Sequence, residues 1–115
     1  MASPQLPNYL RSNRKRLALS QDEVAFLLGT QGGAKVSRYE KFAREPSLET
    51  ALAFEAIFQR PVSELFGGLY QRAERDVAAR AEAHTYKIDR GKSNPQNARM
   101  RQVFNNLANN SHTNS

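Results

Sequence analysis

Apolar residues in the first half of the chain recur at the spacing of short helices. One run has intervals of three and four residues, which places its members on one helix face: Val24, Leu27 and Leu28. Gly29 follows this run, and glycine readily ends a helix because it adopts positive φ. After a polar turn, Val36 and Tyr39 resume the helical spacing, so the sequence predicts a second helix over residues 34–41.

A capping signal precedes the first of these two helices. Ser20 and Glu23 are three residues apart, the spacing at which each side chain can bond the other residue's backbone N–H. Asp22 and Glu23 also place negative charge near the positive end of the helix. The helix is therefore predicted to begin at Gln21.

Three more short helices are predicted around this pair, over residues 8–17, 48–58 and 62–66. The helix over residues 48–58 has a broad apolar face, which is typical of a buried helix. A domain of about 60 residues is small enough to be marginally stable. The large side chains predicted to form one core are Leu10, Leu17, Leu19, Val24, Leu27, Leu28, Val36, Tyr39, Leu48, Leu52, Phe54, Phe58, Val62, Leu65 and Phe66.

The second half of the chain predicts a helical extension over residues 67–108 and a disordered tail over residues 109–115. We expect Gly67-Gly68 to break the chain, followed by an alanine-rich helix, a loop over residues 85–93 and a short amphipathic helix. These helices can form a homodimer, cap their own domain or bind another protein. The residues predicted to form this surface are Tyr70, Val77, Met100, Val103, Phe104 and Leu107.

Composition narrows the class of protein. The chain has 115 residues, a formal net charge of +6 and no cysteine, which excludes disulfides and cysteine-based zinc sites. An excess of positive charge suits a polyanionic partner. Apolar runs are far shorter than the roughly 20 residues that cross a bilayer, and the N-terminus has no signal-peptide core. We therefore predict a cytoplasmic protein without a membrane segment.

Candidate chemistry for catalysis is sparse. His84 and His112 lie far apart in the chain and lack the spacing of metal ligands, and the Asp22-Glu23 pair is explained by the helix cap. No glycine loop beside a strand could hold a nucleotide phosphate. We therefore expect neither an enzyme nor a metal or cofactor.

Residues 8–66 resemble the helix-turn-helix domain of the Cro and phage-repressor (XRE) family. The motifs LSQDEVA, VSRYEK and PSLETAL stand in the family's order and close to its spacing. The resemblance implies an all-α fold, a five-helix lambda-repressor-like bundle followed here by the C-terminal helical extension. It also implies that the third helix enters the major groove of DNA.

Three positions depart from the family pattern. The turn with Gly32 and Gly33 is one residue longer than usual, which leaves the register of the third helix open. Phe42 replaces the glycine that usually ends this helix, so the helix either stops there or continues. Glu55 occupies a position that is usually small and buried, so its carboxylate either reaches the surface or pairs with a cation.

The family resemblance assigns roles to polar residues of the two central helices. Base contacts are expected from Gln31, Lys35, Ser37 and Arg38, and Arg38 can pair bidentately with guanine or hold a phosphate instead. Phosphate contacts are expected from Gln21, Lys41 and Arg44, unless these are ordinary solvated side chains. Arg14 and Glu40 correspond to the family's structural ion pair between the first and third helices.

The sequence therefore predicts a transcriptional regulator that binds double-stranded DNA as a homodimer, most simply a repressor at a palindromic operator. A phage-type repressor, a mobile-element regulator and an antitoxin all fit this class. The alternative is a protein-interaction adaptor that binds its partner through the C-terminal helices. An enzyme is the third class, without a candidate site.

Overall fold

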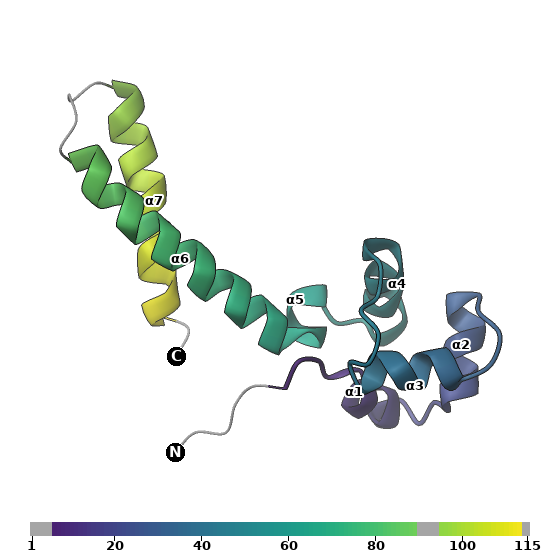
Figure 1. The fold of residues 1–115 in the computed structure, drawn as a ribbon. Coiled ribbons are helices and arrows are strands. Elements are labelled where there is room, and N and C mark those ends of the chain that lie inside the picture. The colour runs from purple at the N-terminus through teal and green to yellow at the C-terminus, as the bar shows by residue number, and fades with distance from the viewer. Residues whose placement is uncertain (1–5, 90–94, 114–115) are drawn as a thin grey trace, which may run out of the picture. The chain divides into compact units, whose positions relative to one another are not determined.

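The computed structural model describes the backbone of residues 6–89 and 95–113, and the side chains of residues 6–84 and 98–109. Within these ranges the chain forms seven helices and no strand, so the predicted all-α class is confirmed (Figure 1). The helices are α1 (Leu10–Arg16), α2 (Gln21–Leu28), α3 (Ala34–Glu40), α4 (Leu48–Phe58), α5 (Val62–Leu65), α6 (Gly67–Asp89) and α7 (Pro95–Thr113).

The chain divides into two compact units, the first ending at Tyr70 and the second beginning at Gln71. The boundary therefore falls inside the first turn of α6. The predicted break at Gly67-Gly68 is wrong, because α6 begins at Gly67. A Cβ on Gly68 would collide with the backbone carbonyl of Leu6. This glycine thus permits a close approach of two backbone segments rather than interrupting a helix.

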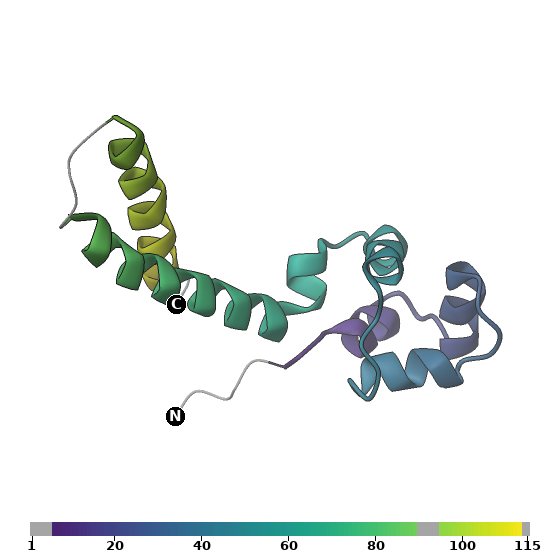
Figure 2. The same ribbon diagram turned by 45° about the horizontal axis from the view of Figure 1, so that its top comes forward.

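The first unit has its core around α4 (Figure 2). Phe54 is completely buried and touches three other rings: Tyr39 edge-on at 5.8 Å between centroids, Phe58 stacked at 5.9 Å, and Phe66 at 6.4 Å. Such aromatic pairs add about 0.5–1.5 kcal/mol each beyond the area they bury. Leu10, Val24, Val36 and Leu65 complete the fully buried set with α1, α2, α3 and α5.

Four leucines predicted for the core are exposed instead: Leu17 at 38%, Leu27 at 54%, Leu48 at 74% and Leu52 at 50%. On α2 the buried residues are Val24 and Ala25. Leu27 lies about 160° around the helix from Ala25, so it cannot share that face. The core is filled at these points by small residues, Ala25 and Ala51, which let the short helices approach closely.

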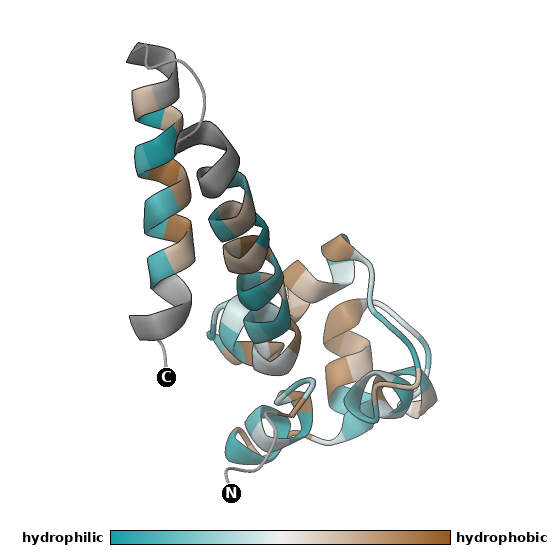
Figure 3. Cartoon of the chain, turned by 60° about the vertical axis from the view of Figure 1, so that its left-hand side comes forward, coloured by the Kyte–Doolittle hydropathy of each residue, from teal (hydrophilic) through white to brown (hydrophobic). Residues whose placement is uncertain are grey.

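The second unit contains α6 from Gln71 onward and the whole of α7. Helix α7 folds back alongside α6 (Figure 1). Ala78 and Ala81 are buried on α6, and the rings of His84 and Phe104 lie 5.2 Å apart. Apolar and polar positions alternate along α7 as an amphipathic helix requires (Figure 3).

Both helices of the second unit are longer than predicted. The loop predicted over residues 85–93 is wrong up to Asp89, and its remaining residues lie outside the described part of the chain. The tail predicted to be disordered from Asn109 is helical up to Thr113. Pairing between two helices stabilises terminal turns that intrinsic propensity alone would not hold. Across the described residues, no helix has both the length and the apolarity to cross a membrane.

Candidate nucleic-acid interface

The N-terminus of α2 is held by the predicted capping box. The Ser20 hydroxyl accepts the N–H of Glu23 at 3.0 Å, and a Glu23 carboxylate oxygen accepts the N–H of Ser20 at 2.8 Å. Two hydrogen bonds lower the pKa of Glu23 below its usual value. The larger effect comes from the bond with the backbone N–H of Ser20, and the smaller effect comes from the bond with the Ser20 hydroxyl. The charged form of Glu23 therefore stabilises the fold.

This shift predicts a pH dependence of stability. Because the folded-state pKa of Glu23 is the lower one, its contribution is complete above the ordinary pKa of a glutamate carboxyl in the unfolded chain. It is lost as the pH falls through the folded-state pKa. Denaturant titrations should show wild type more stable than Glu23→Gln at pH 7, with a gap that shrinks as the pH falls through the range in which glutamate carboxyls take up protons. A gap that widened in acid would contradict this assignment.

The turn between α2 and α3 depends on glycine at two positions with positive φ. Gly29 ends α2 at φ 80°, and Gly32 lies in the turn at φ 74°. The N–H of Gly33 donates to the Asp22 carboxylate at 2.7 Å, which ties the end of the turn to the first turn of α2. The register left open by the longer turn is thereby settled, and α3 begins at Ala34.

Gly33 is needed for a different reason, which is close packing. A Cβ there would lie 2.8 Å from the Gln21 Cβ, 2.9 Å from the Asp22 carboxylate and 3.1 Å from the Gln21 backbone carbon. We expect Gly33→Ala to lower the free energy of unfolding by about 1–3 kcal/mol, as overpacking does.

Gly32→Ala is the matched control for that substitution. It adds the same methyl group where nothing lies within 4 Å, so its cost comes only from the positive φ and should be about 1 kcal/mol. Urea unfolding of both variants measures the difference. Equal stability of Gly33→Ala and wild type would show that the turn moves away from α2 without cost.

Helix α3 buries one face and leaves the other accessible. Val36 and Tyr39 are 1% and 4% exposed, whereas Arg38 is exposed and Lys35 and Ser37 are half-buried. Gln31 is exposed in the preceding turn. The four residues predicted to contact bases therefore lie on one short stretch of chain, and Arg38 is the most open of the three on the helix.

The C-terminus of α3 stops at Glu40 although Phe42 is not glycine. Phe42 adopts φ 55°, the left-handed conformation that favours glycine. The carbonyl oxygen of Arg38 accepts the N–H groups of Ala43 and Arg44 at 2.8 and 3.3 Å. These bonds close the last turn, so α3 does not continue and Arg44 is exposed in the loop beyond it.

An ion pair connects α1 to α3. Arg14 donates from Nε to Glu40 Oε2 at 2.6 Å and from Nη2 to Oε1 at 3.3 Å, while its Nη1 donates to the Leu19 carbonyl at 3.0 Å. The bond to Glu40 raises the pKa of Arg14 despite partial desolvation. The two side chains are only 13% and 4% exposed, so this bidentate pair is largely excluded from water.

Gln21 has a partner that the sequence did not reveal. Its side-chain Nε2 donates to Glu40 Oε1 at 3.2 Å, so the residue predicted to contact phosphate also holds α3. Asn8 was missed altogether. It is buried, and its Nδ2 donates to the Tyr39 carbonyl at 3.0 Å. In the sequence, Asn8 is distinguished only as a polar residue directly before Tyr9 and Leu10.

Positive charge in the first unit is concentrated on one part of the chain. Residues 11–44 carry eight basic and three acidic side chains, whereas residues 45–66 carry one basic and four acidic. The first segment includes α1, α2 and α3, and the second includes α4 and α5. Lys41, predicted to contact phosphate, is exposed one residue beyond α3.

The structure exposes some residues of the predicted partner surface and partly buries the others. Val77 and Val103 are 43% and 49% exposed on the second unit, and Tyr70 is 49% exposed at the end of the first. Met100, Phe104 and Leu107 are half-buried, and the Phe104 ring contacts His84 of the same chain. Docking of α7 on the preceding helix thus uses part of the apolar face and leaves Val103 open.

Glu55 has a structural role, and the described side chains offer no metal site. Glu55 is exposed, and its carboxylate accepts the N–H of Val62 at 2.8 Å, which caps α5 and settles the question about this position. Among the residues whose side chains are described, no group of three His, Cys, Asp or Glu could hold a metal ion.

Comparison of the chain with models of protein families finds no match, and comparisons with curated proteins and with solved structures find none either.

Proposed function

We propose that this protein is a sequence-specific DNA-binding regulator of the Cro and phage-repressor type, with α2 and α3 as its helix-turn-helix. The observation that carries the proposal is the exposure of Arg38 on a helix whose opposite face, Val36 and Tyr39, is buried. A helix held by one face presents its other face in a fixed orientation, which base recognition requires.

The dimensions of α3 suit the major groove. A helix with its side chains is about 10–12 Å in diameter, which matches a groove about 12 Å wide, and the seven residues of α3 would extend about 10 Å along that groove. We assign base contacts to Gln31, Lys35, Ser37 and Arg38. Phosphate contacts are assigned to Gln21 at the start of α2 and to Lys41 and Arg44 after α3.

The charge distribution supports the same partner. The excess of basic residues in residues 11–44 lies in the segment that would face the duplex, while residues 45–66 are acidic. Neutralising several phosphates releases counterions, so affinity should fall steeply as salt is added. We propose a protein that acts in the cytoplasm without a cofactor or catalytic activity.

A single α3 reads only a few base pairs, so the regulator is proposed to act as a homodimer. Among the side chains of the second unit that the structure describes, Val77 and Val103 are exposed large apolar residues available for this contact. Two copies would place their α3 helices about 34 Å apart on a palindromic operator, with half-sites about 10 bp apart. Repression by exclusion of the polymerase is the simplest consequence.

Selection of bound sequences from a random DNA library tests this proposal with the full chain. We expect enrichment of a palindrome and an affinity that falls linearly on a plot of log K against log salt concentration. A library that yields no enriched sequence, or binding that does not respond to salt, would contradict the proposal.

A protein-binding adaptor is the second candidate, favoured by the 49% exposure of Val103 on an otherwise amphipathic helix. Val103→Asp distinguishes the two. In a dimeric regulator the substitution weakens operator binding by dissociating the dimer, whereas in an adaptor it abolishes capture of a different protein and the chain has no operator.

A further inference from the structure

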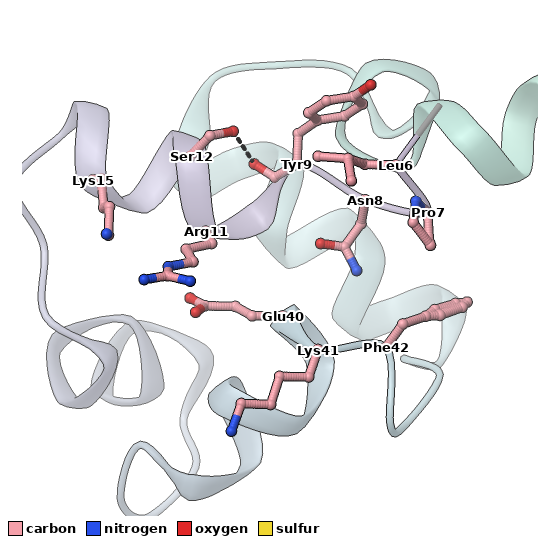
Figure 4. Close-up of a pocket in the computed structure, with 10 residues that line it drawn as sticks. All are labelled: Leu6, Pro7, Asn8, Tyr9, Arg11, Ser12, Lys15, Glu40, Lys41 and Phe42. Carbon is pink, nitrogen blue, oxygen red and sulfur yellow. Dashed lines mark hydrogen bonds between the residues drawn. The ribbon is translucent and has the colours of Figure 1, made fainter. Parts of the chain in front are cut away.

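Two adjacent hollows on the first unit share three of their lining residues, Arg11, Glu40 and Lys41. The polar hollow, about 300 Å³, is completed by Arg14, Gln21 and Ser37. The apolar hollow, about 450 Å³, has a wall formed by Leu6, Pro7, Tyr9 and Phe42 (Figure 4). The cations Arg11 and Lys41 thus lie where the two hollows meet, and neither of them belongs to the Arg14–Glu40 ion pair.

The charges at this junction do not cancel. Glu40 is already paired with Arg14 and bonded by Gln21. Arg11 and Lys41 are both exposed, and no hydrogen bond or ion pair is formed by either side chain within the part of the chain that the structure describes. Two cations thus flank the polar hollow without an anion of their own. A phosphate group has the charge and the acceptor oxygens to occupy that position.

Backbone and side-chain hydrogen bonds hold the segments that form the apolar wall. Asn8 bonds the Tyr39 carbonyl at 3.0 Å, and the N–H of Tyr9 bonds the Leu65 carbonyl at 2.6 Å. These bonds hold the segment before α1 against α3 and α5. Phe42 is fixed by the left-handed turn that ends α3. Figure 4 shows Tyr9, Leu6, Pro7 and Phe42 on the side of the hollow opposite Arg11.

A DNA strand alternates a charged phosphate with a largely apolar deoxyribose, and the paired hollows offer the same alternation. Ser37 of α3 and Gln21 of α2 line the polar hollow, so a strand bordering the groove that α3 occupies would pass over it. Resting on the proposed function, we propose that Arg11 and Lys41 hold one backbone phosphate between them and that the apolar hollow covers the neighbouring deoxyribose. Arg11 is thereby assigned to the interface, although no sequence pattern singled it out.

Removal of Arg11 tests the phosphate assignment. We expect Arg11→Ala to weaken binding of the selected operator and of unrelated DNA by the same factor, roughly three- to tenfold, and to reduce the salt slope by about 1. Arg75→Ala is the matched control, because it removes the same charge from an exposed position on α6. Equal thermal stability of both variants and wild type would verify that folding is unaffected.

Neutral methylphosphonate groups placed singly along each operator strand locate the phosphate. At one position the methylphosphonate should weaken wild type but leave Arg11→Ala unchanged, the non-additivity expected of direct partners. Additive effects at every position would overturn the proposal. So would displacement of the operator by a free deoxynucleotide 5′-monophosphate at micromolar concentration, which would assign the hollows to a small ligand.

The outcomes separate this inference from the proposed function. If Arg38→Ala removes the preference at one base pair of each half-site while Arg11→Ala behaves as Arg75→Ala does, the chain is a regulator and the Arg11 site is wrong. If wild type selects no sequence and binds no DNA, both proposals fail together.

Discussion

Replacing Arg38 with alanine is expected to cost about 1–3 kcal/mol of binding to the selected operator and almost nothing on unrelated DNA. The side chain is exposed on α3 while its neighbours Val36 and Tyr39 anchor the helix, so its loss should not disturb the fold. The selected sequence should also lose its preference at one base pair in each half-site. Fluorescence anisotropy with operator and scrambled duplexes measures both affinities.

Arg44→Ala is the control for that experiment. Arg44 is exposed in the loop after α3 and is proposed to contact phosphate, so its removal should weaken both duplexes equally. An equal loss on both duplexes for Arg38→Ala as well would assign Arg38 to the DNA backbone rather than to a base.

Replacing Arg14 with methionine is expected to lower the free energy of unfolding by about 3 kcal/mol. The substitution keeps the aliphatic volume but leaves the Glu40 carboxylate, only 4% exposed, without its cation. The effect should lie at the lower end of the range for buried pairs, because Arg14 is 13% exposed and Gln21 still donates to Glu40. Urea denaturation at pH 7 provides the measurement.

The double variant Arg14→Met with Glu40→Leu should recover most of that loss, because no uncompensated charge remains. It also separates stability from orientation. If the ion pair positions α3, the double variant should fold stably and still bind the operator more weakly than wild type. A double variant that is as unstable as Arg14→Met would show that packing, not charge, carries the effect.

The capped helix pair is the part of the fold that could be predicted most fully. Ser20, Glu23 and Gly29 act on backbone atoms within a few residues, so their bonds depend on local sequence and not on distant partners. The bounds of α2 and the start of α3 were accordingly correct. The sequence could not predict whether α3 ends before Phe42. A phenylalanine in the left-handed conformation is costly, and this cost is offset by hydrogen bonds to the Arg38 carbonyl that form only in the folded turn.

The candidate site was predictable in part for a related reason. Residue type and helical position were enough to nominate Arg38, Lys35 and Ser37. Arg11 was not nominated, because the role proposed for it depends on lying beside Lys41 and on Glu40 being neutralised by Arg14. Contacts between α1 and α3 bring together residues about 30 positions apart, which no local pattern specifies.

By itself the sequence determined that this protein is helical, where α2 begins and ends, and which side chains on α3 are polar, since hydrogen bonds and helical periodicity within a few residues decide these features. Only the tertiary structure decided which apolar residues are buried. Leu27 and Leu48 are exposed while Ala25 and Ala51 lie in the core, because the space left between short, closely packed helices selects side chains by volume as well as by hydrophobicity.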